Sequence, residues 1–310
     1  MMVAANFLGA LAPLLGSASA FPAQNALAPV SDWRENPTQL TLQVYVPSKI
    51  AAKPAVILAL HYCGGTGAAY SQTTEYNSLA DSKGFVVMYP SQAKDNHCWD
   101  VATAKTLTHD GGGDSTGLAN MIKWAIKEYD ADPTKIFVTG SSSGCMMSNV
   151  MAATYPDLVA AVSCYSGVAA GCLAGSPGSS PQSADPACAN GQHVKTGAQW
   201  AAQVKAMYPA CNGSYPRFQT WHGEADNFVN YPNLAEQLKE WSTILGVTWT
   251  NDNTNTPQSG YTQIVSGDGT KLVGYSARGV GHTVPVHEDA DLKWFGISHM
   301  LYFDPLIDPL

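Results

Sequence analysis

The sequence of 310 residues predicts an α/β fold, with a mostly parallel central sheet that helices cover on both faces. Two observations predict it. Short apolar runs, typical of strands buried on both faces, alternate along the chain with segments that favour helices. One of these runs leads through a Gly-x-Ser-x-Gly turn into a segment rich in Met and Ala, as in a strand that turns sharply into a helix.

Four strands are expected up to residue 140. Residues 39–46 alternate apolar and polar and end at Pro47, which predicts a half-exposed strand. The other three are short and apolar, as expected of buried strands: residues 55–60, 84–90 and 136–139. Helices are expected over residues 70–82, through Met121, Trp124 and Ile126, and from the glycine turn to Ala153.

The same alternation continues after this turn. Further strands are expected over residues 158–164 and 218–221, helices over 233–245 and 289–301, and a hairpin over 261–278. The hairpin turns at residues 266–269, which contain two glycines. Residues 167–190 lack periodicity and contain Cys172 and Cys188, one near each end. This pattern predicts a long surface loop or lid closed by a disulfide.

No repeat, linker or appended module is visible, so residues 21–310 are expected to form a single domain. Residues 7–15 are apolar and are followed by Ala18-Ser19-Ala20, which resembles a signal-peptidase site, although the usual positive charge before it is missing. We therefore expect residues 1–20 to be a signal peptide and the mature protein to be secreted. No apolar segment is long enough to span a bilayer.

The composition excludes several classes of partner. The formal net charge is −8, only 13% of residues are charged, and the basic ones are scattered, so neither nucleic acid nor a membrane is expected as a partner. There is no Cys-x-x-Cys pair, phosphate loop or dinucleotide fingerprint, so neither a metal nor a cofactor is expected. A monomer is expected.

Gly140 to Gly144 surround the candidate nucleophile, Ser142. The glycines are expected because a Cβ at either position would clash with neighbouring backbone in so tight a turn. The turn exposes the Ser142 hydroxyl above the sheet and directs the first amides of the next helix toward a developing oxyanion. An ordinary Gly/Ser loop is the alternative, but the preceding strand and following helix favour a nucleophile.

A nucleophilic serine needs a base and an acid that orients the base, and in this kind of sheet they follow in the order Ser, acid, His. Asp226 lies just past a strand end and is the expected acid; Glu224, two residues earlier, is the alternative. His282 follows Gly279-Val280-Gly281 on a loop past a strand and is the expected base.

Other histidines receive lesser roles. His287 could line the site, and His299 is expected to pack in the last helix or lie on the surface. His61 and His222 precede the acid and are expected to orient loops by hydrogen bonds. The oxyanion hole is expected to use the amides of Ser143, after the nucleophile, and Cys63, in the glycine-rich loop after an earlier strand.

Together these segments resemble the fungal acetylxylan esterases and related feruloyl esterases of carbohydrate esterase family 1, from about Leu40 to Phe295. The resemblance rests on ILALHYCGGTG, CWDV, LTHDGGGDS, VTGSSSGCMMSNVMAATYP, YSGVAAGC, HGEAD and GVGHTVPVH. It implies an α/β-hydrolase fold, a Ser142–Asp226–His282 triad and oxyanion amides at Cys63 and Ser143. Tyr62, Trp99 and His287 are the residues expected to bind substrate.

The resemblance also implies the bridges Cys63–Cys98 and Cys172–Cys188. Seven cysteines cannot all pair, so at least one thiol is expected to be free. Cys145 could pack as a small apolar side chain or pair with Cys164 or Cys211. Asn212-Gly213-Ser214 is a candidate glycosylation site. The lid lacks a tryptophan that relatives carry before Cys188, which leaves the acyl preference open.

The sequence thus favours a secreted serine esterase that removes acetyl groups from xylan, without a cofactor. Three alternatives remain open. The same triad could release ferulate or another hydroxycinnamate from feruloylated xylan, or it could depolymerise short-chain polyesters. A cell-wall-binding protein that retains the fold without turnover is the third, although no triad residue is missing.

Overall fold

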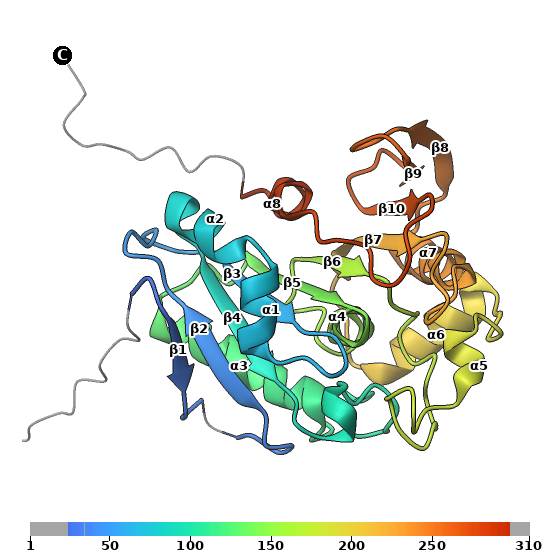
Figure 1. Ribbon diagram of the computed structural model, residues 1–310. Coiled ribbons are helices and arrows are strands. Elements are labelled where there is room, and N and C mark those ends of the chain that lie inside the picture. Colours follow the sequence, from blue (N-terminus) through green and yellow to red (C-terminus); the bar gives the residue numbers. More distant parts are fainter. Residues whose placement is uncertain (1–23, 34, 298–310) are drawn as a thin grey trace, which may run out of the picture.

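The computed structural model describes residues 24–33 and 35–297. In these residues one ten-stranded, twisted sheet has the order β1-β2-β4-β3-β5-β6-β7-β10-β9-β8 (Figure 1). The strands are β1 (Leu27–Val30), β2 (Thr41–Tyr45), β3 (Val56–Leu60), β4 (Val86–Ser91), β5 (Ile136–Ser141), β6 (Ala161–Tyr165), β7 (Arg217–Gly223), β8 (Trp249–Thr254), β9 (Tyr261–Ser266) and β10 (Leu272–Ala277). From β4 to β10 neighbouring strands are parallel, and the outer pairs are antiparallel, which confirms the mostly parallel sheet.

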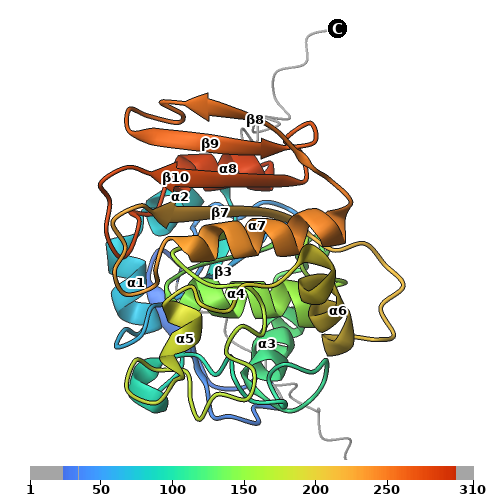
Figure 2. The same ribbon diagram turned by 90° about the vertical axis from the view of Figure 1, so that its right-hand side faces the viewer.

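Helices cover both faces of this sheet (Figures 1 and 2). They are α1 (Gly67–Thr73), α2 (Tyr76–Lys83), α3 (Asp114–Glu128), α4 (Ser143–Thr154), α5 (Pro186–Ala189), α6 (Gly197–Met207), α7 (Pro232–Leu245) and α8 (Glu288–Phe295), with a 3₁₀ turn, η1 (Asp95–His97). Helices α3, α4, α6 and α7 share one core with the sheet, whereas α1, α2 and α8 share another on the opposite face. No helix in residues 24–33 and 35–297 has the length and apolar character needed to cross a membrane.

Strand β3 shows why a continuous apolar run is needed at the centre. Its residues Val56, Leu58 and Leu60 belong to the core with α3 and α4, and Ile57 and Ala59 belong to the core on the other face. Since burying a Val, Leu or Ile side chain stabilises a fold by roughly 1.5–3 kcal/mol, both faces of β3 favour a central place in the sheet. Strand β5, which leads into the turn with Ser142, lies directly beside it.

Some elements differ from the sequence-based expectations. The helix expected over residues 70–82 is two helices, because Thr74 is extended (φ −126°, ψ 156°) and its hydroxyl donates to the Tyr70 carbonyl. Strands β1 and β8 and helix α6 were not predicted. Helix α8 ends at Gly296, whose left-handed φ of 75° terminates it. The remainder of the helix expected over 289–301, including His299, and the expected signal peptide, residues 1–20, lie outside the described residues.

Three disulfides join cysteines among the described residues. Both bridges implied by the resemblance, Cys63–Cys98 and Cys172–Cys188, are present. The third, Cys145–Cys164, links the first turn of α4 to β6, so Cys145 pairs with Cys164 and does not remain a free apolar side chain. Cys211 is a free thiol, in agreement with the odd cysteine count.

A buried carboxyl group fastens α8 to the sheet. Asp291 is fully buried, and its carboxyl group accepts hydrogen bonds from Ser163, Tyr165 (2.7 Å), Gln219 (2.9 Å) and Tyr76. Burial raises the pKa of Asp291 to about 7, although the hydrogen bonds from Ser163, Tyr76 and Tyr165 oppose the rise. The folded protein therefore holds this proton at pH values at which the unfolded chain has lost it.

We predict that this group makes the protein less stable as the pH rises from about 4 to about 7. Its contribution is complete below its unfolded pKa and falls by up to ~1.4 kcal/mol per pH unit until the folded pKa is reached. Asp291→Asn, which imitates the protonated acid, should remove this part of the pH dependence of the free energy of unfolding, measured by urea denaturation. Asp289→Asn, an exposed position on the same helix, is the control. An unchanged slope in Asp291→Asn would contradict the assignment.

Candidate active site

The turn from β5 into α4 holds Ser142 in a strained conformation, with φ 54° and ψ −116°. Its amide donates to the Tyr165 carbonyl on β6 at 2.8 Å, which fixes the turn against the next strand. Both glycines are required by close approach. A Cβ on Gly144 would lie 2.0 Å from the carbonyl oxygen of Leu60, and one on Gly140 would lie 2.5 Å from the Gly144 carbonyl carbon. A strained residue of this kind is typical of functional sites.

The structure brings Ser142, His282 and Asp226 into one hydrogen-bonded line. The Nδ1 atom of His282 lies 2.7 Å from Oδ2 of Asp226, and its Nε2 atom lies 2.8 Å from the Ser142 hydroxyl oxygen. Because a carboxylate only accepts, Nδ1 carries the proton and Nε2 is left to accept from the hydroxyl. This arrangement suits removal of the serine proton.

The loop after β7, which we call the acid loop, holds Asp226 as a carboxylate. Its Oδ1 atom accepts from the amides of Phe228 (3.0 Å) and Val229 (2.9 Å). Burial alone would raise the pKa of Asp226, but the hydrogen bonds from His282 and these amides outweigh it and hold the pKa below its usual value. His222 fastens the same loop, since its Nε2 atom donates to the Val229 carbonyl at 2.7 Å.

The alternative acid, Glu224, does not meet His282. Its Oε1 atom instead accepts a hydrogen bond from the Ser276 hydroxyl on β10, at 2.7 Å. The two carboxylates of HGEAD therefore differ in their partners, because Glu224 still pairs with β10 through its amide, whereas Asp226 lies in the turn that follows.

The loop after β3 lies beside the nucleophile. Tyr62 and Cys63 line the same cavity as Ser142. The Cys63 amide donates to no acceptor among the described residues, so it is available to a ligand. His61 is fully buried; its Nδ1 atom donates to the Tyr62 carbonyl at 2.7 Å, and its Nε2 atom accepts from the Gln92 amide at 3.2 Å. Burial lowers the pKa of His61 to about 4, so it orients this loop as a neutral side chain.

Trp99 was expected to bind substrate, and this prediction was wrong. Its side chain is completely buried, because the indole N–H donates to the His61 carbonyl at 2.9 Å. Its amide donates to the Ser143 hydroxyl at 2.8 Å. Cys98, the residue before it, is bridged to Cys63. The dipeptide Cys98-Trp99 thus ties together the two segments that carry the expected oxyanion amides; we call it the oxyanion brace.

The cavity at Ser142 has a volume of about 460 Å³ and combines an apolar wall with the triad. Apolar side chains of α4, the lid and the acid loop line it: Met146, Val168, Leu173, Pro181 and Phe228. Phe228 is 67% exposed, and its ring centroid lies 5.7 Å from that of His282, at the mouth of the cavity. Sequence reasoning did not single out Phe228, although it lies two residues past the expected acid.

His287 does not line this cavity. Its ring stacks on Trp221, with 4.7 Å between the centroids, and meets the edge of Tyr261. Another histidine, His193, follows the lid and lies next to Cys172 and Cys188, but both cysteines are in a disulfide and cannot act as thiolate ligands. In the part of the chain that the structure describes, this is the single cluster with metal-ligand spacing.

The oxyanion brace should support catalysis without contributing to substrate binding. Trp99→Phe removes the indole N–H that donates to His61, and Ser143→Ala removes the hydroxyl that accepts from the Trp99 amide. We predict that each variant lowers kcat for 4-nitrophenyl acetate by roughly tenfold and leaves KM nearly unchanged. Displaced oxyanion donors reduce the stabilisation of the transition state and not the binding of the substrate. Ser148→Ala is the control, because that buried hydroxyl on α4 bonds within its own helix, to Gly144. A rise in KM at constant kcat would show that the brace shapes the substrate site instead.

Comparison with known proteins finds esterases that resemble this chain over most of its length. The family model described as esterase PHB depolymerase matches residues 40–263. Feruloyl esterase B of Talaromyces funiculosus is 46% identical over 88% of this chain and 77% of its own length. Acetylxylan esterase A of Aspergillus ficuum is 44% identical over 88% of this chain and 90% of its own length.

A solved structure extends the likeness to three dimensions. An acetyl xylan esterase from Aspergillus awamori superposes with a TM-score of 0.83 at 43% identity, covering 88% of this chain and 100% of that one. The resemblance to these esterases and the α/β-hydrolase-like fold are thereby confirmed. This chain belongs to the esterase PHB depolymerase family and is a carboxylic ester hydrolase.

Proposed function

We propose that this esterase removes acetyl groups from xylan, with Ser142, His282 and Asp226 as its catalytic triad. The observation that carries the proposal is the hydrogen-bonded line from Asp226 through His282 to Ser142, at the wall of a cavity open to ligand. Relatives named acetylxylan esterase, 43–44% identical over about 90% of their length, support the choice of substrate.

In the proposed mechanism, the Ser142 oxygen attacks the acetyl carbonyl while Nε2 of His282 takes the hydroxyl proton. Asp226 holds the other ring nitrogen and stabilises the imidazolium that forms. The amides of Cys63 and Ser143 stabilise the oxyanion, an effect worth about 3 kcal/mol per donor. Collapse of the oxyanion breaks the bond between the acetyl carbon and the sugar oxygen, His282 protonates that oxygen to the free sugar hydroxyl, and the acetyl group remains on Ser142.

The second half of the reaction uses the same residues in reverse. His282 removes a proton from water, which attacks the acetyl-serine carbonyl, and the second oxyanion occupies the same two amides. Collapse of this intermediate releases acetate and returns the proton to Ser142. No metal or cofactor is needed for any of these steps.

Feruloyl esters are the second candidate substrate. A relative named feruloyl esterase B shares 46% identity, and the apolar cavity of about 460 Å³ has room for an acyl group larger than acetyl. In this alternative the triad is the same, and only the acyl group that packs against Met146 and Leu173 differs. A cell-wall-binding protein without catalytic turnover is disfavoured, because all three triad side chains are present and joined by hydrogen bonds.

The proposal includes secretion. Three disulfides among the described residues suit an oxidising compartment, and residues 1–20 have the pattern of a signal peptide. Asn212 is exposed, as a glycosylated asparagine has to be. Acetylated xylan is then met outside the cell, by a chain that we expect to act as a monomer.

The test compares acetate release from acetylated xylan with ferulate release from methyl ferulate, for the wild type and Ser142→Ala at equal concentration. We predict that acetate release dominates and falls by at least 10⁴-fold in Ser142→Ala, since a triad nucleophile contributes on this scale. Dominant ferulate release, equally lost in the variant, would support the second candidate. Activity retained by Ser142→Ala would refute the assigned nucleophile.

A further inference from the structure

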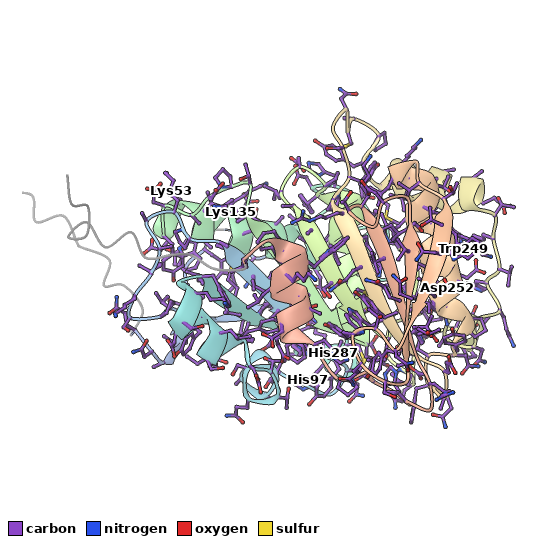
Figure 3. The ribbon with its side chains drawn as sticks, turned by 90° about the horizontal axis from the view of Figure 1, so that it is seen from above. Lys53, His97, Lys135, Trp249, Asp252 and His287 are labelled. Atoms are coloured by element: carbon purple, nitrogen blue, oxygen red, sulfur yellow. A yellow bond between two sulfur atoms is a disulfide. The ribbon has the colours of Figure 1, made fainter. Side chains whose placement is uncertain are left out.

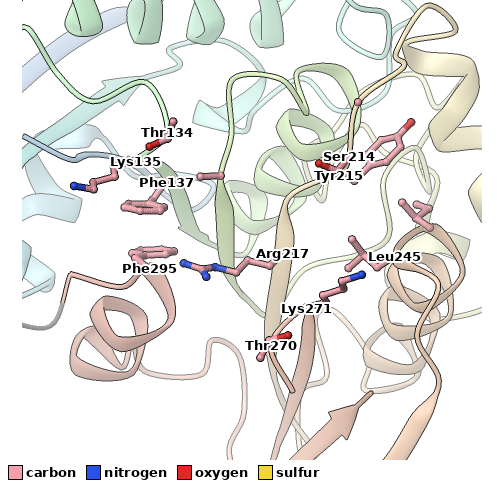
Figure 4. Close-up of a pocket in the computed structure, with 13 residues that line it drawn as sticks. Thr134, Lys135, Phe137, Ser214, Tyr215, Arg217, Leu245, Thr270, Lys271 and Phe295 are labelled. Carbon is pink, nitrogen blue, oxygen red and sulfur yellow. The ribbon is translucent and has the colours of Figure 1, made fainter. Parts of the chain in front are cut away.

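A second cavity, of about 780 Å³, lies at the opposite ends of the parallel strands from Ser142 (Figure 4). Its walls include Lys135, just before β5, Arg217, the first residue of β7, and Lys271, just before β10. In Figure 3, Lys135 lies toward the top of the view, and His97, which follows the cavity-lining residue Asn96 at the active site, lies toward the bottom. The two cavities are therefore separated by the length of the strands.

The charge of this second cavity opposes that of the whole protein. The chain carries 24 acidic and 16 basic residues, yet the described lining residues comprise three basic side chains and no acidic one. Lys135 is paired with Asp132 at 3.3 Å, outside the lining. No ion pair joins Arg217 or Lys271 to an acid in the described part of the chain. The cavity is thus locally cationic.

Arg217 is the side chain of this cavity that has an unused hydrogen-bond donor among the described residues. Its Nε atom is enclosed and has no hydrogen-bond acceptor among the described residues. Its guanidinium lies over the ring of Trp294, with 5.7 Å from Cζ to the centroid. Burial lowers the pKa of Arg217, and no nearby carboxylate counters this effect. Because a buried donor without an acceptor is destabilising, an anion that accepts a hydrogen bond from this guanidinium would be stabilised.

The surrounding walls carry apolar side chains and a hydroxyl as well as positive charge, and the cavity has room for a group larger than a bare inorganic anion. Phe137 and Phe295 stack with 4.6 Å between their centroids, and Figure 4 shows the Arg217 side chain extended toward this pair. Leu245 lies on the other side of the cavity, and Ser214 offers a hydroxyl at the rim. Apolar walls with a few polar groups are the usual lining of small-molecule sites.

We propose that this cavity binds a uronic acid residue of an acidic saccharide, with its carboxylate on the guanidinium of Arg217. The planar guanidinium binds a carboxylate through two parallel hydrogen bonds, and Lys271 adds positive charge. The inference rests on the proposed function in one respect: it takes the saccharide to be a xylan that carries uronic acid branches. The site would then hold the polymer at a distance from the triad.

The test measures binding, so that it does not depend on turnover. Ser142→Ala protein is titrated calorimetrically with a xylo-oligosaccharide carrying one uronic acid and with a neutral one of equal length. We expect the acidic ligand to bind at least tenfold more tightly and to weaken as salt is added. Arg217→Gln should abolish this tenfold preference, whereas Lys53→Gln, an exposed lysine paired with Asp130, should preserve it.

Equal affinities for the two oligosaccharides, or a preference that survives Arg217→Gln, would overturn the proposal. Displacement of the acidic ligand by an equal concentration of inorganic phosphate would also overturn the proposal, because the cavity would then be a general anion site. Should Arg217→Gln melt at a much lower temperature, Arg217→Lys and the exposed Lys271→Gln provide the test, and each should weaken the preference. Hydrolysis of 4-nitrophenyl acetate should be unchanged in Arg217→Gln, so failure of the acetylxylan assignment remains a separate result.

Discussion

The close approach of the α4 backbone to the end of β3 is the constraint on which the site depends. With only 2.0 Å between a Cβ on Gly144 and the Leu60 carbonyl oxygen, no other residue fits without moving the helix. This contact places the first amides of α4 beside the loop that carries Cys63. It also fixes the strained Ser142 at the point where the loops of β7 and β10 deliver Asp226 and His282. The positions of the proposed nucleophile, base and oxyanion donors thus all depend on one backbone contact.

The sequence was most informative where local chemistry determines structure. A glycine turn between an apolar strand and a helix has few alternative conformations, so Ser142 could be proposed as the nucleophile. The order of acid and base then led to Asp226 and His282, and the structure joins these three side chains by hydrogen bonds. The choice between Asp226 and Glu224 depended on how the loop leaves β7. Only the structure shows Glu224 bonded to Ser276, a contact that no spacing rule predicts.

Features set by distant contacts could not be predicted. Trp99 follows a cysteine in a polar loop, where a tryptophan is a reasonable candidate for binding a ligand. Its position is instead fixed by hydrogen bonds to His61 and Ser143. Strand β8 is exposed throughout and polar after Trp249, so its strand conformation comes from pairing with β9 and not from an apolar pattern. Helix α6 did carry a local signal that was overlooked, the capping box formed by Thr196 and Gln199.

The most direct test of the central claim is covalent labelling by a serine-directed phosphonate, followed by peptide mapping with mass spectrometry. The geometry predicts a single adduct, on the Ser142 oxygen, and a labelling rate that falls by orders of magnitude in His282→Ala, because the base is needed to activate the hydroxyl. An adduct on another serine, or equal labelling rates in the two proteins, would contradict the account.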